Sequence, residues 1–178
     1  MKIISGLYKK RELLSPNSSK THPMGSREKL SLFNMLGFYL KNAEVLDAFS
    51  GSGALGLEAL SRGAKKVIFV EKSPKVARII KENCKTLKIS PEAYEVIIKD
   101  INKIDFPSNS FDIIIADPPY DNFKIEEIEK LVKPLKSNGI LALSSPSTFP
   151  DKNLVLSNSE PISSHSYAAA RISLFKKI

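Results

Sequence analysis

A glycine-rich turn between an apolar strand and a helix restricts the fold of this chain more than any other feature. Residues 45–49, Val-Leu-Asp-Ala-Phe, predict a buried strand, and residues 50–53 follow as Ser-Gly-Ser-Gly. Residues 54–62 then show helical apolar spacing and stop at Gly63, a residue that favours a helix C-terminus. A strand, a glycine turn and a helix in this order are typical of an α/β protein that binds a ligand at the turn.

The same alternation of strands and helices continues along the chain. Further apolar runs predict strands at residues 67–70, 95–98, 111–116 and 140–143. Helices are predicted at residues 74–87 and at about 124–135. Two closing strands, at 154–156 and 171–175, are expected to be antiparallel across a loop rich in Ser, Pro and Ala. Because each parallel crossover needs about a dozen residues, which a helix supplies, the pattern predicts a doubly wound α/β fold.

The chain carries its positive charge mostly at the beginning. Of its 178 residues, 27 are basic and 19 are acidic, which gives a net charge of +8. Residues 1–41 hold eight basic and two acidic side chains, whereas residues 42–178 hold 19 and 17. We therefore expect a basic N-terminal extension at residues 1–25 and one folded domain at residues 26–178. A polyanion such as a nucleic acid is a candidate partner.

The extension is predicted to contain a short two-stranded ribbon at residues 3–13 and a loop at residues 15–20. The candidates for contacts with phosphate groups are Lys9, Lys10 and Arg11. A helix at residues 26–40 is expected next. The side chains expected to pack this helix on the body are Leu30, Phe33 and Leu36 or Gly37.

Composition and pattern exclude several classes of protein. Hydrophobic residues make up 42% of the chain, which is too many for a disordered protein. The longest aliphatic runs are far shorter than the ~20 residues that span a bilayer, and the opening apolar stretch is too brief for a signal peptide. The single cysteine, Cys84, cannot form an internal disulfide and is expected to be buried. We expect a cytoplasmic protein with no membrane or metal partner.

Acidic residues follow three of the predicted strands. Glu71, Asp100 and Asp117 stand at strand ends, and the carboxyl ends of parallel strands share one cleft with the glycine turn. Glycines at 51, 53 and 56, with Glu71 twenty positions after Gly51, also fit a dinucleotide-binding pattern. An NAD-dependent redox protein therefore remains an alternative.

S-adenosylmethionine fits these residues better than NAD. Asp47 lies inside the first strand, where its carboxylate can meet a cationic amino group, and no second set of residues for hydride transfer is visible. Glu71 can accept both ribose hydroxyls, and Asp100 with Ile101 can contact the adenine. The candidate cofactor-binding residues are Asp47, Phe49, Ser50, Gly51, Gly53, Glu71, Lys72, Asp100, Ile101 and Asp117.

The motif Asp117-Pro118-Pro119-Tyr120, at the end of the fourth predicted strand, is the most specific chemical signal. Two prolines fix the backbone, so the Asp117 carboxylate and the Pro118 carbonyl can stand as two acceptors at a fixed separation. Such a pair accepts both hydrogens of an exocyclic amine and turns its lone pair towards a methyl donor. The ring of Tyr120 can stack on a planar base. The motif therefore predicts methyl transfer to a base amine.

Several segments together resemble one enzyme family, the RsmD-type methyltransferases of small-subunit ribosomal RNA. The segments that carry the resemblance are residues 47–64, 70–72 and 117–120, with 3–6, 32–34, Tyr167 and 171–175 in addition. The resemblance implies a Rossmann-like class I methyltransferase fold with a seven-stranded, mostly parallel sheet and S-adenosylmethionine as cofactor. It also implies transfer to the N2 amine of a guanine in 16S ribosomal RNA, free or within a small-subunit particle. We expect a monomer.

The chain departs from the family pattern in two places. Residues 22–30 keep only Pro23, Arg27 and a basic residue at Lys29 of the family's loop, and Ser144-Ser145 stand where the family has an acid. Arg27 is the fourth candidate RNA contact. Because the Asp-Pro-Pro-Tyr motif recognises an amine rather than guanine, the N6 amine of DNA adenine and a protein glutamine amide remain alternative substrates.

Overall fold

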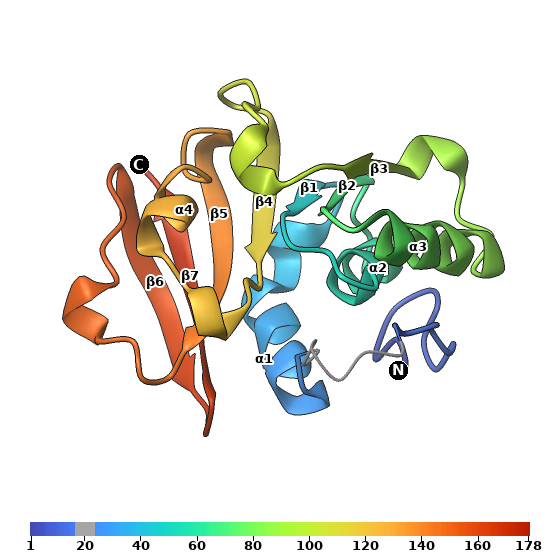
Figure 1. Cartoon of the computed structure of the whole chain (residues 1–178), viewed down its shortest axis with the longest axis horizontal. Helices are drawn as coiled ribbons and strands as arrows, with labels where there is room; N and C mark the ends of the chain where they lie inside the picture. Colours follow the sequence, from blue (N-terminus) through green and yellow to red (C-terminus); the bar gives the residue numbers. More distant parts are fainter. Residues whose placement is uncertain (17–23) are drawn as a thin grey trace.

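One seven-stranded sheet organises the computed structural model, which describes residues 1–16 and 24–178 (Figure 1). The strands are β1 Glu44–Asp47, β2 Lys66–Glu71, β3 Tyr94–Ile98, β4 Phe111–Ala116, β5 Leu135–Pro146, β6 Ser159–Ser166 and β7 Ala170–Lys177. Their order is β3-β2-β1-β4-β5-β7-β6; the first five are parallel neighbours, and β7 is antiparallel to both β5 and β6. The predicted Rossmann-like fold with an antiparallel end is therefore confirmed. Part of the predicted loop at 15–20, as well as His22 and Pro23, lies outside the described residues.

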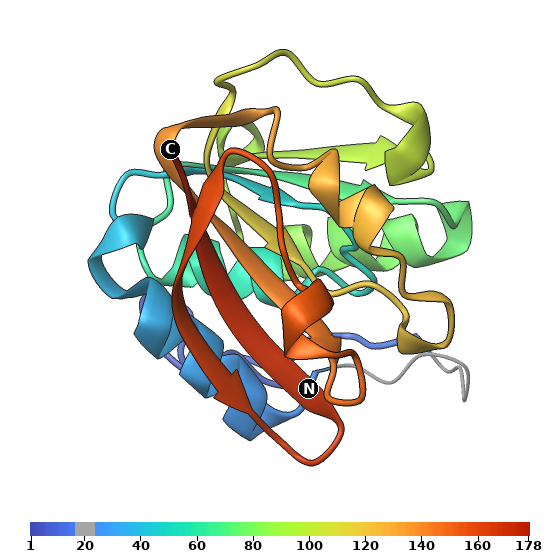
Figure 2. The same ribbon diagram turned by 90° about the vertical axis from the view of Figure 1, so that its left-hand side faces the viewer.

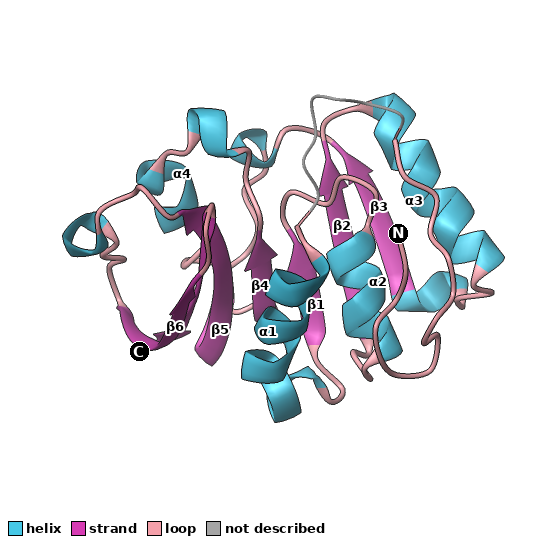
Figure 3. Cartoon of the chain, turned by 90° about the horizontal axis from the view of Figure 1, so that it is seen from below, coloured by secondary structure: helices cyan, strands magenta, loops and turns pink. Residues whose placement is uncertain are grey.

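Helices cover both faces of the sheet, as Figure 3 shows from below. In the part of the chain that the structure describes, the four α-helices are α1 Ser26–Leu36, α2 Ala54–Ser61, α3 Pro74–Thr86 and α4 Ile125–Glu129. Short 3₁₀ turns are η1 Gly37–Leu40, η2 Pro91–Ala93, η3 Ile101–Lys103, η4 Tyr120–Asn122 and η5 Asp151–Asn153. One core cluster joins α1, α2 and α3 to one sheet face, and a second cluster joins α4 to the other face. Cys84 of α3 is buried in the first cluster, as expected.

The helix predicted at 124–135 is much shorter in the structure. Helix α4 ends at Glu129, and β5 begins at Leu135, five residues before the strand that the sequence predicted. Pro134 explains the difference, because a proline has no N–H to donate within a helix and pushes the preceding residue out of helical geometry. The apolar residues that imitated a helical stripe, Leu131 and Val132, are instead buried in the turn between the two elements.

The closing region also differs from its prediction. Residues 154–156 are not a strand; Leu156 is buried in the second core cluster, which accounts for its apolar character. The strand that pairs with β7 is β6, inside the stretch predicted to be a loop. Most β6 residues are exposed on the edge of the sheet, so they carry no apolar alternation for a sequence pattern to detect. Figure 2 shows β5, β7 and β6 side by side with α1 next to them.

Helix α1 is shorter and turned relative to its prediction. It ends at Gly37, whose φ of 41° lies in the left-handed region that glycine favours, and the 3₁₀ turn η1 follows. Leu30, predicted to pack on the body, is 41% exposed. The residues that α1 buries are Lys29, Leu32, Phe33 and Leu36. Because Lys29 lies on the packed face, the apolar residues alone did not predict this side of the helix as the buried one.

The N-terminal residues pack on the domain, and they do not form a regular ribbon. A single antiparallel bridge pairs Lys2 with Glu12, and the residues between them form turns. The Glu58 carboxylate of α2, which is fully buried, accepts hydrogen bonds from the backbone N–H groups of Ile4 at 2.8 Å and Ser5 at 3.0 Å. Buried Ile3 belongs to the first core cluster. This docked segment, residues 1–16, is called the head below.

None of the helices in the described ranges is long and apolar enough to cross a membrane.

Candidate active site at the carboxyl edge of the sheet

The four predicted acids lie at the carboxyl edge of the sheet. Asp47 ends β1, Glu71 ends β2, Asp100 follows β3 and Asp117 follows β4. These strands are parallel neighbours, so their carboxyl ends meet at one edge. Burial raises the pKa of Asp47, and the negative charges of the nearby Asp117 and Glu71 raise it further.

The glycine turn is held in a sharp bend above β1. The backbone N–H of Ser50 donates to the carbonyl of Val70 at 3.0 Å, and the N–H of Gly53 donates to the carbonyl of Ser50 at 2.7 Å. Gly51 and Gly53 have φ values of 52° and 81°, which residues with a Cβ rarely adopt. A Cβ at Gly51 would meet no heavy atom within 4 Å, so the turn is open on this side. A ligand can therefore approach the backbone closely here.

Asp47 links the strand to the helix that follows the turn. Its Oδ2 accepts a hydrogen bond from the backbone N–H of Gly56 at 2.9 Å, which caps the first turn of α2 from inside β1. The side chain is 1% exposed, and this burial raises its pKa to about 7, although the Gly56 N–H opposes the shift. The sequence predicted an encounter with a cation; the capping bond is an additional role.

Glu71 connects the glycine turn to the start of α3. Its two carboxylate oxygens accept hydrogen bonds from the N–H of Gly51 at 3.0 Å and from the N–H of Ser73 at 2.8 Å. An ionised carboxylate offers about four acceptor sites, so capacity for ribose hydroxyls remains. Lys72, the next residue, is exposed.

The predicted adenine contacts lie at the next strand end. The Oδ1 of Asp100 accepts a hydrogen bond from the N–H of Asn102 at 3.0 Å and caps η3. Ile101 and Phe49 are both partly buried and pack against the second core cluster. They provide apolar surface beside the acids, as a planar ring requires.

The Asp-Pro-Pro-Tyr motif follows β4 directly. Burial raises the pKa of Asp117 to about 6, and a hydrogen bond from Ser144 opposes the shift. Pro118 is buried and Pro119 is exposed. Tyr120 begins η4, and its hydroxyl shares a hydrogen bond with the Ser144 hydroxyl. Ser144 lies on β5 and is 1% exposed.

Sequence reasoning noted Ser144 as a departure from the family and missed its place in the site. The structure brings it between Asp117 and Tyr120 because β5 is the parallel neighbour of β4. Adjacent parallel strands end side by side, and this signal could have found the residue.

The candidate RNA contacts remain on the surface. Lys9, Lys10 and Arg11 are exposed on the head, and a guanidinium nitrogen of Arg11 donates to the carbonyl of Thr86 in α3 at 3.3 Å. Arg27 is exposed in the first turn of α1.

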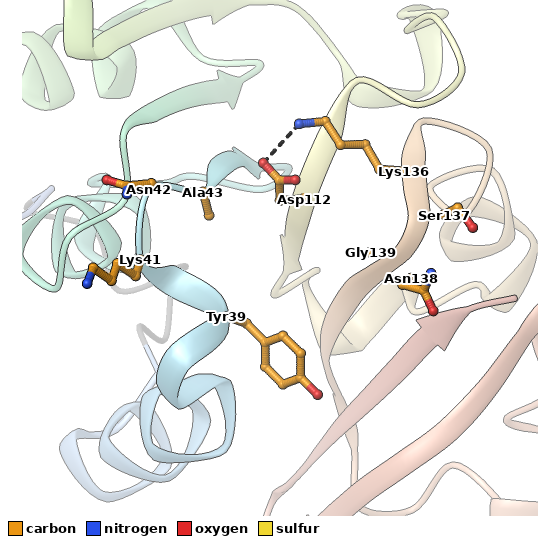
Figure 4. A pocket seen from close by; sticks show the side chains of 9 residues that line it. All are labelled: Tyr39, Lys41, Asn42, Ala43, Asp112, Lys136, Ser137, Asn138 and Gly139. Carbon is orange, nitrogen blue, oxygen red and sulfur yellow. Dashed lines mark hydrogen bonds and ion pairs between the residues drawn. The ribbon is translucent and has the colours of Figure 1, made fainter.

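Figure 4 shows a hollow at the opposite, amino edge of the sheet, where residues precede or begin β1, β4 and β5. Its lining is Tyr39, Lys41, Asn42, Ala43, Asp112, Lys136, Ser137, Asn138 and Gly139. None of the predicted site residues is among them. The chemistry therefore belongs to the carboxyl edge, where the glycine turn and the acids meet.

The strand order, the antiparallel seventh strand and the acids around a glycine turn define a Rossmann-like methyltransferase. The family model described as Conserved hypothetical protein 95 matches residues 1–174. Ribosomal RNA small subunit methyltransferase D of Haemophilus influenzae is 46% identical over 132 residues, which cover 71% of this chain and 67% of that protein. The protein of the same name from Escherichia coli K12 is 35% identical over 145 residues, or 80% and 70% of the two chains.

Solved structures agree with the sequence relatives. The structure of yhhF from Escherichia coli has a TM-score of 0.84 at 26% identity and covers 99% of this chain and 97% of its own. A tRNA m1G37 methyltransferase of M. jannaschii has a TM-score of 0.71 at 20% identity, over 88% of this chain and 50% of its own, and shares the fold. The chain belongs to the Conserved hypothetical protein 95 family of RsmD-like methyltransferases. It is an enzyme that uses S-adenosylmethionine, which decides against the NAD alternative.

The residues at the carboxyl edge suit this cofactor. Asp47 is a buried carboxyl whose ionisation is opposed by burial and by two neighbouring carboxylates, and a cationic amino group would relieve both penalties. The open side of Gly51 lets a ligand approach the turn. Bound S-adenosylmethionine supplies an electrophilic methyl group.

Proposed function

We propose that this enzyme methylates the exocyclic N2 amine of a guanine in small-subunit (16S) ribosomal RNA. The observation that carries the proposal is the Asp117–Tyr120 motif at the end of β4, beside the glycine turn and with Tyr120 bonded to Ser144. The names of the relatives from Haemophilus influenzae and Escherichia coli support ribosomal RNA as the substrate. The expected cytoplasmic location fits this substrate, and a monomeric state remains a prediction.

The motif explains how the exocyclic amine can be aligned with the methyl group. Such an amine is a weak nucleophile because its lone pair is delocalised into the ring of the base. The Asp117 carboxylate and the Pro118 carbonyl accept the two amine hydrogens, which leaves the nitrogen lone pair to point at the methyl group. Tyr120 stacks on the flipped-out base, and base–aromatic stacking contributes about 1–3 kcal/mol. The Ser144 hydroxyl fixes the far end of the Tyr120 ring.

The same carboxyl can handle the proton that methyl transfer releases. When the nitrogen–carbon bond forms and the methyl–sulfur bond breaks, the nitrogen becomes cationic and must lose one proton. Asp117, whose pKa is raised to about 6, is ionised at neutral pH and stands beside that nitrogen as acceptor. Proton loss completes the reaction and leaves a neutral methylated amine.

A protein amide is a second substrate class for such a motif. A release factor glutamine methyltransferase from Borreliella burgdorferi is 35% identical, but over 98 residues that cover only 55% of this chain and 33% of that protein. The ribosomal RNA methyltransferases match more of the chain, as does the family model, which begins at residue 1. They therefore favour an RNA base over an amide or a DNA base.

Mass-spectrometric mapping of methylated nucleosides tests the proposal. Small-subunit ribosomal RNA from cells with and without the protein would be digested and compared, and purified protein would be added back with labelled S-adenosylmethionine. We expect one N2-methylguanosine that is absent without the protein and restored by it. Unchanged ribosomal RNA, together with labelling of DNA or of a protein glutamine, would contradict the proposal.

A further inference from the structure

Helix α3 presents a row of cations to solvent. Lys75, Arg78, Lys81 and Lys85 are exposed and follow one another at spacings of three or four residues, so they lie on one side of the helix. This set is called the α3 row below. From position 72 to 88 the chain holds six basic residues and a single acidic one, Glu82, which shares the exposed side. The net charge of residues 42–178, which is close to zero, does not reveal this local cluster of basic residues.

Packing does not require the row. The opposite side of α3 is buried through Ala77, Ile80, Asn83 and Cys84, which anchor the helix on the sheet. The start of the helix is also fixed: the Ser73 hydroxyl accepts a hydrogen bond from the N–H of Val76, and Pro74 occupies the first turn. Within residues 1–16 and 24–178, no carboxylate lies within 4.0 Å of a nitrogen of the row. Lys29 and Arg171, by contrast, have carboxylate partners.

The row joins the cofactor edge to the head. At its beginning, the N–H of Ser73 donates to Glu71, one of the predicted cofactor ligands. At its end, Arg11 of the head donates to the carbonyl of Thr86. In Figure 3 the N-terminal segment runs beside α2 and α3. At a rise of about 1.5 Å per residue, the ten steps from Lys75 to Lys85 extend over about 15 Å.

We propose that the α3 row binds the sugar–phosphate backbone of the RNA substrate and, with the cations of the head, leads the strand to the carboxyl edge. The inference rests on the proposed RNA substrate. Parallel strands are about 4.8 Å apart, so the start of α3, at the end of β2, lies about 10 Å from the end of β4, where the base amine is held. A length of about 15 Å matches about four nucleotides of an RNA strand at ~3.4 Å each.

A nucleic acid suits the row better than a membrane. A helix that lies on a membrane inserts an exposed apolar side between the lipid headgroups. The apolar side of α3 is buried against the sheet, and the exposed side carries the four cations of the row together with Glu82. A straight row of charges without apolar neighbours is what phosphate groups require, since their contacts are electrostatic and independent of sequence.

A charge-matched pair of variants tests the proposal. The first is Lys75→Gln, Arg78→Gln and Lys81→Gln together. The control is Lys103→Gln, Lys130→Gln and Lys152→Gln, which removes three exposed cations that also have no carboxylate partner in the described ranges. Affinity for a small-subunit ribosomal RNA transcript is measured between about 50 and 300 mM salt, over which the Debye length falls from ~14 to ~6 Å. Calorimetry with S-adenosylmethionine and thermal unfolding show whether each variant keeps its fold.

The slope of log affinity against log salt is the deciding quantity. Each phosphate contact contributes about 0.7–0.9 to this slope, so the α3-row variant should lose about 2–3 units and the control less than about 1. Equal slopes for the two variants would overturn the inference. If the triple variant unfolds, Lys81→Gln alone should lower the slope by about 0.7–0.9, and an unchanged slope would overturn the inference equally.

The outcome for the proposed function is read separately, from the unmodified enzyme. If the wild-type enzyme methylates the transcript and the two variants bind it with equal salt slopes, the proposed function stands. RNA binding by the α3 row is then refuted. Wild-type enzyme that neither binds nor methylates the RNA, both as a transcript and within a small-subunit particle, refutes the proposed function, and the row with it. Binding to anionic vesicles but not to RNA, present in the wild type and lost in the α3-row variant, would overturn the inference in favour of a membrane surface.

Discussion

The hydroxyl groups of Tyr120 and Ser144 lie 2.5 Å apart and join the start of η4 to the carboxyl end of β5. Burial raises the pKa of the Tyr120 hydroxyl, so it stays protonated at neutral pH and can donate or accept in this bond. The ring is thereby fixed at both ends, by the backbone at Pro119 and by β5 at its tip. A fixed ring loses less conformational entropy when it stacks on a base.

Replacing Ser144 should weaken turnover more than cofactor binding. A hydrogen bond of this kind contributes about 1 kcal/mol, so Ser144→Ala should lower the methylation rate roughly fivefold while the affinity for S-adenosylmethionine stays unchanged. Single-turnover kinetics and calorimetry measure the two quantities. Ser145→Ala is the matched control, because the Ser145 hydroxyl is buried and has no hydrogen-bond partner among the described residues. Equal rates for the two variants would show that Ser144 does not position Tyr120.

The reaction should slow as the pH falls through about 6. Asp117 must be ionised to accept one amine hydrogen beside the Pro118 carbonyl and then to take up the released proton, and burial raises its pKa to about 6. About one tenth of the enzyme is in the active form at pH 5 and about nine tenths at pH 7, so kcat/KM should fall about tenfold between them. Rates would be measured at each pH with the binding of S-adenosylmethionine followed in parallel, which separates the contribution of Asp47. A profile that is flat from pH 5 to 8 would contradict this role for Asp117.

Asp47 should make the ligand-free protein less stable as the pH rises. Its pKa is raised to about 7 by burial, whereas an unfolded chain releases the proton near pH 4. The folded state therefore binds more protons between these values, and the contribution of this carboxyl to stability is largest below about pH 4 and is lost as the pH approaches 7. Asp47→Asn keeps an oxygen acceptor for Gly56 and loses this dependence.

The prediction for Asp47 is read from melting temperatures. Thermal unfolding of the wild type and of Asp47→Asn, both without ligand, should show the variant gaining on the wild type as the pH increases from 4 to 7. A difference between the two melting temperatures that does not change with pH would show that Asp47 does not titrate in this range.

Removing the Glu58 carboxylate should unfold the protein at a lower temperature. Glu58 accepts two N–H groups of the head and pairs with Arg62 at 2.8 Å and Lys29 at 3.8 Å, all with little exposure. Breaking a buried charge network costs about 3–5 kcal/mol, which corresponds to roughly 6–20 °C for a chain of this size. Glu12→Gln, at the exposed pair with Lys2, should change the melting temperature by less than about 2 °C. If Glu58→Ala and Glu12→Gln had the same melting temperature, the stabilising role of this network would be refuted.

The strands at the centre of the sheet were predictable because they are buried on both faces. Residues 113–116 form an unbroken apolar run within the strand predicted at 111–116, and β4 has these same bounds. Strand β6, in contrast, is an exposed edge strand with a Ser-rich sequence that shows no strand pattern. Its extended conformation depends on its pairing with β7. Helix α4 was overextended for a related reason: Leu131 and Val132 are apolar because the second core cluster needs them, whatever the backbone conformation.

The site was predictable where backbone chemistry demanded particular residues, as at Gly51 and the Pro118-Pro119 pair. Ser144 was not, since serine on a strand is ordinary and its meaning depends on which strand lies next to it. Asn83 shows the same limit more strongly. Buried on α3, it bonds to both backbone groups of Leu14 in the head and to the Ser52 carbonyl in the glycine turn. Contacts that span 31 and 69 positions of sequence leave no local pattern.

In the proposed reaction Asp117 holds the amine that receives the methyl group, and the methylation rate of Asp117→Ala is the sharpest test of this role. The measurement is single-turnover methylation of small-subunit ribosomal RNA at saturating S-adenosylmethionine, with cofactor affinity from calorimetry. We expect the rate to fall at least about 100-fold, the loss typical of a positioned group that acts in the transition state, while cofactor affinity is kept. Methylation at the wild-type rate by Asp117→Ala with normal cofactor binding would contradict the account.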